Sequence, residues 1–150
     1  MKMTQAGIAR PFPDVDPVRR RIMAAIRSRN TKPERKVRSA LHADGYRFRI
    51  HAKELPGSPD IVFTRRRIVI FIHGCFWHSH SGCKQSQIPK TRSAYWVEKL
   101  TRNVMRDEDN LERLRMLGWR TAVVWECEDR DEWLSRLRKL LGPPRFPAWR

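Results

Sequence analysis

The fold and the chemistry of this chain both depend on the stretch Ile68-Val69-Ile70-Phe71-Ile72-His73-Gly74-Cys75-Phe76-Trp77-His78-Ser79-His80-Ser81-Gly82-Cys83. Its first five residues are apolar and mostly β-branched, which is typical of a buried strand. The strand pattern stops at His73-Gly74, and residues 73–83 contain three histidines, two cysteines and two aromatic residues. A core strand that ends among metal-ligating and aromatic side chains predicts a functional site at that end of the strand.

Length and charge narrow the class of protein. The 150 residues predict one domain with one substantial core. Lysine and arginine number 32 against 16 aspartates and glutamates, which gives a net charge of +16. This excess favours a polyanionic partner, nucleic acid first and an anionic membrane surface second. A basic surface that serves solubility alone is the alternative.

The sequence also bears on location and redox state. No apolar run approaches the roughly 20 residues that cross a bilayer, and the N-terminus lacks an apolar signal core. We therefore expect no membrane contact and a cytoplasmic protein. The three cysteines, an odd number, argue against a disulfide framework and leave metal binding or free thiols.

The N-terminal part of the chain predicts an arm followed by helices. We expect residues 1–15 to form a flexible arm, residues 16–141 to form the folded domain with its first helix opening at Asp16-Pro17, and residues 142–150 to form a tail. A second helix, ending at Gly45, opens with Thr31-Lys32-Pro33-Glu34, which fits a capping box. Glu34 therefore has two interpretations, a helix cap and a member of the site.

A predicted hairpin brings a carboxylate to the central strand. Residues 46–51 alternate in the manner of a strand, and a second strand covers residues 61–63. Asp60 directly precedes that second strand, and Thr64-Arg65-Arg66-Arg67 turns the chain back into the central one. The pairing should place Asp60 near the His73 end of its partner.

The remaining elements complete an α/β pattern. Spacing of apolar residues predicts a helix over 94–117, a strand over 119–125 and a helix over 131–141. Alternating helices and strands predict an α/β layer fold. Cys127 follows the last strand, so both functional segments lie at strand ends, where open α/β sheets place their sites.

Two kinds of site can be built from these residues. Soft sulfur with imidazole suits a tetrahedral zinc site, and the candidate ligands are Cys75, His80, Cys83 and Cys127, although Cys127 could instead be a buried thiol. That set leaves other histidines free, and three side chains converge at one end of the hairpin: Asp60, His73 and His78. An aspartate can hold Mg²⁺ and a histidine can accept a proton from water, so phosphodiester hydrolysis is a coherent hypothesis, with structural histidines as the alternative.

Aromatic residues stand beside these ligands. Phe76 and Trp77 lie between polar neighbours, so their rings could stack on bases or wedge a base step apart. Trp96 begins the long predicted helix, on an apolar stripe, and core packing is the competing interpretation for it.

Several spaced motifs resemble the very short patch repair (Vsr) DNA mismatch endonucleases, from about Ile26 to Cys127. The most specific is His73-Gly74-Cys75-Phe76-Trp77-His78. The others, in chain order, are Pro59-Asp60-Ile61-Val62-Phe63, His80 with Cys83, Pro89-Lys90-Thr91-Arg92, Trp96, Asn103 with Arg106-Asp107, Gly118-Trp119-Arg120 and Trp125-Glu126-Cys127.

The resemblance implies a restriction-endonuclease-like mixed sheet flanked by helices, with a structural zinc site, and a Mg²⁺-dependent nick 5′ to the thymine of a T:G mismatch that arises when 5-methylcytosine deaminates. Asp60 would hold Mg²⁺ with the Ile72 carbonyl, and His78 would be the general base. The family pattern assigns supporting roles to Asp107, which would orient His78, and to His73 and Glu34, which would assist near the phosphate. It also implies zinc ligation by Cys75, His80, Cys83 and Cys127, and a DNA wedge of Phe76, Trp77 and Trp96.

The chain departs from the pattern in two places. The glutamate-x-lysine of restriction-type nucleases is replaced by Phe71-Ile72-His73, and the segment from His80 to Cys83 is one residue longer.

We expect a monomer that binds double-stranded DNA, with mismatch-repair proteins as candidate further partners. Two alternatives remain: a restriction or mobile-element nuclease with another target, and a zinc-stabilised DNA-binding module without catalysis.

Overall fold

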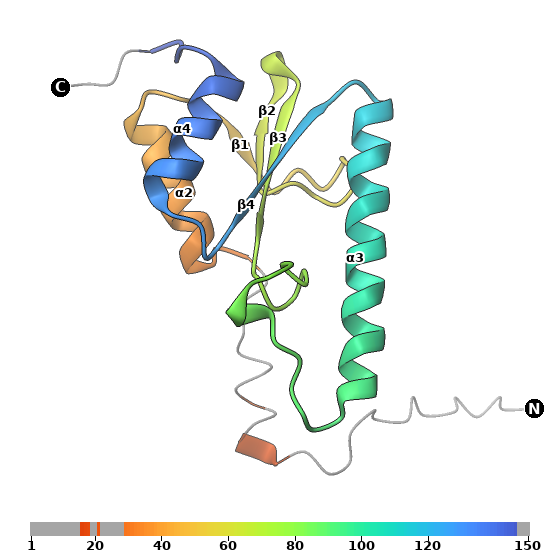
Figure 1. Cartoon of the computed structure of the whole chain (residues 1–150). Helices are drawn as coiled ribbons and strands as arrows, with labels where there is room; N and C mark the ends of the chain where they lie inside the picture. Colours follow the sequence, from red (N-terminus) through yellow and green to blue (C-terminus); the bar gives the residue numbers. More distant parts are fainter. Residues whose placement is uncertain (1–15, 19–20, 22–28, 147–150) are drawn as a thin grey trace, which may run out of the picture. The chain divides into compact units, whose positions relative to one another are not determined.

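A computed structural model describes residues 16–18, 21 and 29–146, and the chain divides into two compact units, residues 1–31 and 32–150. The second unit contains the elements that carry the site (Figure 1). They are helix α2 (Lys32–Ala43), strands β1 (Arg49–Ile50), β2 (Ile61–Phe63) and β3 (Ile68–His73), helix α3 (Ser93–Met116), strand β4 (Arg120–Trp125) and helix α4 (Arg130–Leu141). Two short 3₁₀ helices, η1 (Thr64–Arg66) and η2 (Lys84–Ser86), lie in the connections.

The four strands form one mixed sheet in the order β1-β2-β3-β4. Strand β2 pairs antiparallel with both β1 and β3, while β3 and β4 are parallel. The predicted α/β class and the β2–β3 hairpin are thus confirmed. The predicted strand over 46–51 is shorter than expected, because only Arg49 and Ile50 pair with β2 and Tyr46 is buried in the core instead.

Helices cover both faces of this sheet, α2 and α4 on one and α3 on the other (Figure 1). The two cores agree with that arrangement. Leu41 of α2 and Leu137 of α4 are buried against one face together with Ile61, Ile68 and Ile70. Leu114 of α3 is buried against the opposite face together with Val62, Val69 and Phe71. Successive side chains of β2 and β3 point to opposite faces of the sheet, so these strands contribute to both cores. The carboxyl end of β3 therefore lies between α2 and α4 on one face and α3 on the other.

The helix ends follow from local sequence. Gly45 and Gly118 adopt φ of +93° and +82°, a conformation that suits glycine. Beyond them, the Tyr46 N–H donates to the Leu41 carbonyl and the Trp119 N–H to the Leu114 carbonyl, so each helix stops where the next strand or loop must begin. Both predicted helix ends are confirmed.

The predicted terminal segments are described only in part. Pro17, Val18 and Arg21 are helical, and the Val18 N–H donates to Asp16 Oδ1 at 3.1 Å, as expected of a helix start. The arm over 1–15 and the apolar positions Ile22, Ala25 and Ile26 lie outside the described residues. At the other end, Arg66 donates to the carbonyls of Leu141 and Pro143, so the start of the predicted tail contacts the β2–β3 turn. Within the described part of the chain, none of the helices has the length and apolar character needed to cross a membrane.

Candidate active site and metal centre

Three groups of metal-ligating side chains gather around the carboxyl end of β3 and the start of β2. In each group, one ligand atom from every residue lies within 4.8 Å of the others. The groups are Glu34, His51 and Asp60; His73, His78 and Asp107; and Cys75, His80, Cys83 and Cys127. Every catalytic and zinc-ligating side chain expected from the sequence belongs to one of these groups.

Asp60 lies beside the end of β3, as the hairpin predicted. Its Oδ2 accepts a hydrogen bond from the Ile72 N–H at 2.7 Å. Burial raises the pKa of Asp60 to about 6, and the neighbouring Glu34 carboxylate also raises it, whereas the bond from Ile72 lowers it. A buried carboxylate next to a second acid favours a cation between them.

Glu34 lies deeper than a surface cap requires. It stands in the first turn of α2, yet only 4% of it is exposed. Its Oε2 is 3.7 Å from Nε2 of His51. Glu34 therefore faces Asp60 and His51. This position favours the interpretation of Glu34 as a member of the site.

His73 and His78 lie face to face, with ring centroids 3.8 Å apart and an angle of 4° between the rings. His78 Nδ1 is 2.5 Å from Asp107 Oδ2, a carboxylate supplied by α3. Burial, with a further contribution from His78, lowers the pKa of His73 to about 4, so His73 is neutral at physiological pH. A neutral His73 lets its stacked neighbour take up a proton without facing a second positive charge.

The cysteine group surrounds one imidazole nitrogen. His80 Nδ1 is 3.6 Å from Cys75 Sγ and 3.3 Å from Cys127 Sγ. The His80 ring stacks on Trp125, with centroids 4.1 Å apart, which fixes its orientation. Burial raises the pKa of Cys75 to about 12, so in the absence of a cation this thiol would stay protonated. Three sulfurs and one nitrogen held this way are the donor set of a closed tetrahedral zinc site.

The aromatic residues of the loop pack on α3 and on one another. Phe76 lies 5.1 Å from Trp77 and 5.3 Å from Trp96 between ring centroids, and Lys99 Nζ lies 5.4 Å from the Trp77 centroid. All three rings are half-buried, and none belongs to either core. For Trp96 the core interpretation is therefore wrong, because its ring packs on the loop and not under the sheet.

Three supporting residues were assigned no role from the sequence, although Asn103 and Glu126 lie within the motifs quoted above. Glu126 Oε1 accepts the Cys75 N–H at 2.8 Å, and Asn103 Nδ2 donates to the Trp77 carbonyl at 3.0 Å, so both hold the loop after β3. The third is His51. Asn103 could have been found, because it lies on the same face of the predicted helix as Trp96 and Asp107. Glu126 is marked only by its place in the Trp125-Glu126-Cys127 motif, and nothing in the sequence pattern marks His51.

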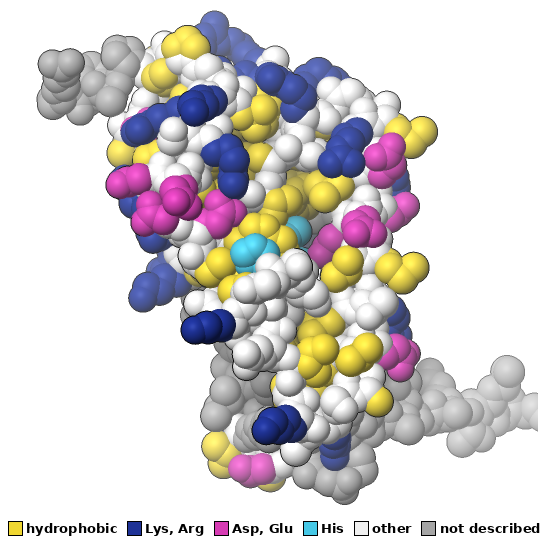
Figure 2. All heavy atoms as spheres, in the orientation of Figure 1, with side chains coloured by type: hydrophobic (Ala, Val, Ile, Leu, Met, Phe, Trp, Pro, Cys, Tyr) yellow, Lys and Arg dark blue, Asp and Glu magenta, His cyan; other side chains and the backbone are white. Residues whose placement is uncertain are grey.

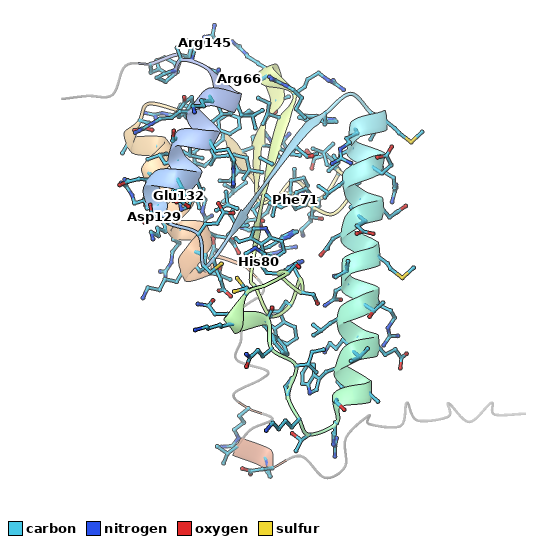
Figure 3. The ribbon with its side chains drawn as sticks, in the orientation of Figure 1. Arg66, Phe71, His80, Asp129, Glu132 and Arg145 are labelled. Atoms are coloured by element: carbon cyan, nitrogen blue, oxygen red, sulfur yellow. The ribbon has the colours of Figure 1, made fainter. Side chains whose placement is uncertain are left out.

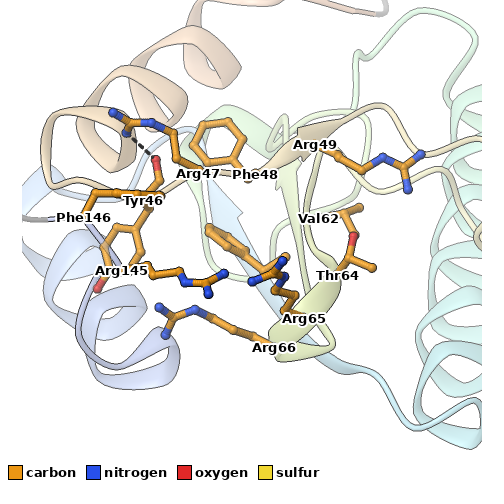
Figure 4. A pocket seen from close by; sticks show the side chains of 11 residues that line it. Tyr46, Arg47, Phe48, Arg49, Val62, Thr64, Arg65, Arg66, Arg145 and Phe146 are labelled. Atoms are coloured by element: carbon orange, nitrogen blue, oxygen red, sulfur yellow. Dashed lines mark hydrogen bonds between the residues drawn. The ribbon is translucent and has the colours of Figure 1, made fainter.

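A separate pocket of about 610 Å³ lies at the opposite end of β3, around the β2–β3 turn (Figure 4). No acidic or histidine side chain lines it among the described residues, so it is not the catalytic site. Its basic side chains are Arg47, Arg49, Arg65, Arg66 and Arg145. Figure 3 labels Arg66 and Arg145 at the pocket end of the sheet and His80 at the opposite end. Figure 2 shows Lys and Arg side chains gathered at the pocket end, and histidine at the surface near the middle of the same face.

Comparison with known proteins gives consistent matches. The family described as DNA mismatch endonuclease Vsr matches residues 14–85. The chain is 53% identical over 132 residues to the type II nicking enzyme V.XorIIP of Xanthomonas oryzae pv. oryzae, covering 86% of this chain and 96% of that one. It is 47% identical over 105 residues to DNA mismatch endonuclease Vsr of Escherichia coli, covering 70% of this chain and 67% of that one. It is also 44% identical over 117 residues to the type II nicking enzyme V.NmeAIP of Neisseria meningitidis, covering 78% and 83%.

Proposed function

Because this chain belongs to the Vsr family of DNA mismatch endonucleases, we propose that it nicks one strand of duplex DNA 5′ to the thymine of a T:G mismatch, with Mg²⁺ as its catalytic cation. The observation that carries the proposal is the convergence of Asp60 with the His73–His78 pair at one end of β3. Such a site offers a cation ligand and a proton acceptor on the same side of one phosphodiester.

The donors around Asp60 fit a hard divalent cation. Oδ2 is taken by the Ile72 N–H, which leaves Oδ1 for a metal. The His73 carbonyl accepts a hydrogen bond from the Glu126 N–H and so points toward β4. The backbone carbonyls of successive residues in a strand point toward opposite neighbouring strands. The Ile72 carbonyl therefore points away from β4, toward Asp60. When bound, Mg²⁺ supplies charge that neutralises the phosphate and stabilises the leaving oxygen.

His78 is the proposed general base. The Asp107 carboxylate at its Nδ1 favours the tautomer that carries the proton there, which leaves the Nε2 lone pair free to accept a proton from water. His73, neutral and stacked beside it, holds the plane of the ring. Glu34 faces the Asp60 carboxylate from the first turn of α2 and would contribute negative charge to the cation site.

We also assign structural zinc to Cys75, His80, Cys83 and Cys127. The support is the donor set itself, three sulfurs and a nitrogen with all four atoms within 4.8 Å. Cys127 comes from the end of β4 and the other three from the loop after β3, so zinc would tie the loop to the sheet.

Replacing Cys127 with serine should remove bound zinc and lower thermal stability. Loss of a direct ligand should cost more than about 2 kcal/mol, which lowers the melting temperature of a chain this size by at least about 4 °C. Elemental analysis and calorimetry measure both quantities. Ser81→Ala, at an exposed position of the same loop, is the control and should keep the zinc. A wild-type protein that is fully folded without zinc would refute the assignment.

The aromatic cluster of Phe76, Trp77 and Trp96 is the proposed DNA wedge. The rings are half-buried and braced by one another and by Lys99, so little conformational freedom is lost when they insert. Unstacking a base step costs a few kcal/mol and costs least at a mismatch, so a rigid wedge favours T:G over a matched pair.

Replacing Phe76 and Trp77 together with alanine should lower the T:G-to-matched binding ratio by about tenfold, given 1–3 kcal/mol for each stacked base. The salt dependence of binding should stay the same, because no phosphate contact is lost. Phe146→Ala removes an exposed ring at the far end of the sheet and should leave the ratio unchanged. An unchanged ratio in a folded double variant would mean that this loop packs the protein and does not probe DNA.

The decisive test of the function compares two duplexes that differ only in one T:G pair. The strongly basic chain, at +16, should bind both through their phosphates. With Mg²⁺ only the mismatched duplex should be nicked, 5′ to its thymine, and EDTA should stop the reaction. Equal cutting of both would favour a nuclease with another target, and binding without cutting would favour a non-catalytic module. A DNA substrate also agrees with the cytoplasmic location expected from the sequence.

A further inference from the structure

His51 lies against Asp60 because of how β1 and β2 pair. Ile50 is opposite Ile61, so His51, the residue that follows β1, falls opposite Asp60, and its N–H donates to the Asp60 carbonyl at 3.3 Å. His51 then adopts φ of +51°, outside the extended region, and ends the strand. Its imidazole is thereby held at the acidic end of the hairpin, opposite the first turn of α2.

The outer nitrogen of this imidazole is buried without a hydrogen bond. Among the described residues, His51 Nε2 has no hydrogen-bond partner and is inaccessible to solvent. The nearest acidic oxygen, Glu34 Oε2, is 3.7 Å away, which is too long for a hydrogen bond. A buried nitrogen left in this state costs free energy, so its position calls for a partner at the site.

The atoms around this nitrogen suit a cation. One oxygen each of Glu34 and Asp60 lies with His51 nitrogen inside a group whose members are all within 4.8 Å of one another. Two ligands bound to a cation at about 2.1 to 2.3 Å lie at most about 4.6 Å apart. Shifts of a few tenths of an ångström would therefore bring all three atoms to a common ion.

We propose that His51 Nε2 is a nitrogen ligand of the divalent cation at Asp60, with Glu34 as the third side-chain ligand beside the Ile72 carbonyl. This inference rests on the proposed function, in which Asp60 holds the catalytic cation. A donor set of two carboxylates and one imidazole is softer than the all-oxygen set that suits Mg²⁺. The site therefore binds Mn²⁺ more tightly than Mg²⁺, and His51 is the source of that preference.

The chain offers a matched comparison for this residue. His42 is an exposed histidine of α2, outside all three groups of ligating side chains. His51→Gln keeps a polar side chain of similar length but lacks the imidazole nitrogen, and His42→Gln makes the same change away from the site. The zinc-loaded full chain is used throughout, so that added Mn²⁺ does not enter the cysteine group.

Pulsed electron paramagnetic resonance of bound Mn²⁺ tests the proposal directly. Wild type and His42→Gln should show coupling of Mn²⁺ to a ligand ¹⁴N. Labelling the histidines of wild type with ¹⁵N should replace this ¹⁴N coupling with a ¹⁵N coupling. His51→Gln should lose the coupling and bind Mn²⁺ at least about tenfold more weakly, a loss no smaller than that from an outer-shell partner. Its Mg²⁺ affinity should change less, so the Mn²⁺-to-Mg²⁺ preference should collapse.

Wild-type protein without a nitrogen signal would overturn the proposal, whether or not the variant folds. A ¹⁴N coupling signal in His51→Gln as strong as that of wild type would also overturn the proposal, because the nitrogen ligand would then come from His73 or His78. Nicking of the T:G duplex by the same preparations tests the proposed function separately from the His51 ligand. Mismatch nicking without Mn²⁺–nitrogen coupling refutes this ligand alone, whereas coupling without mismatch nicking refutes the proposed function and leaves the ligand in place.

Discussion

Replacing Asp60 with asparagine should abolish nicking of a T:G duplex while leaving DNA binding nearly unchanged. The amide keeps the shape of the side chain and its bond from Ile72 but loses the charge that holds the cation. A catalytic cation contributes several kcal/mol to the transition state, so the loss should be on the order of 10³-fold or more in rate. Single-turnover cleavage measures the rate, and fluorescence anisotropy of labelled duplex measures binding.

Asp109→Asn is the control, because Asp109 is an exposed carboxylate of α3 paired only with Arg113 among the described residues. It should cut at the wild-type rate. DNA affinity should fall little in either variant, because lysines and arginines hold the phosphates. An Asp60→Asn enzyme that cuts as fast as wild type would remove this residue from the cation site.

The burial of Asp60 should make activity and stability respond oppositely to pH. Burial raises its pKa to about 6 in the folded protein, above the ordinary value of 3.8. Below about pH 6 the carboxyl becomes protonated and can no longer hold a cation, so nicking should decline there. The folded state meanwhile binds that proton more readily than the unfolded chain does, so the contribution of Asp60 to stability is lost as pH rises through 6. Asp60→Asn should therefore be more heat-stable than wild type at neutral pH.

The parts of this site that could be predicted from sequence are those built by short-range connections. Asp60 and Ile72 meet because a tight turn joins two short strands, and alternation fixes their register. The three zinc-ligand candidates of the loop lie within nine residues of one another. Cys127 could be added because zinc chemistry asks for a fourth soft ligand and the last predicted strand ends beside it.

The parts that could not be predicted depend on long-range packing. His51 reaches Asp60 only through the register of β1, and a strand with two paired residues leaves almost no periodic pattern to identify. Glu126 holds the Cys75 N–H through the parallel pairing of β3 with β4, which the sequence does not specify. Trp96 shares an apolar stripe with Leu100, so only the rotation of α3 decides that its ring meets the loop while Leu100 is buried.

Replacing His78 with alanine should slow nicking by about 10² to 10⁴, the usual contribution of general acid–base catalysis. The zinc content and the melting temperature should stay close to those of wild type, because His78 belongs to a different group from the cysteines. Single-turnover rates at saturating Mg²⁺ and DNA isolate the chemical step. His42→Ala, which removes an exposed imidazole of α2, should have no effect.

The 2.5 Å contact between His78 and Asp107 makes a sharper test available than either residue alone. If Asp107 acts by fixing the tautomer and orientation of His78, it has no role once the imidazole is gone. The loss in the double variant His78→Ala with Asp107→Asn should then match that of His78→Ala alone, as for residues that act as a unit. Losses that multiply would mean that Asp107 acts on the DNA or on the helix independently, and His78 would need another source of its orientation. His73, stacked on the same ring and kept neutral by burial, is the side chain positioned to provide it.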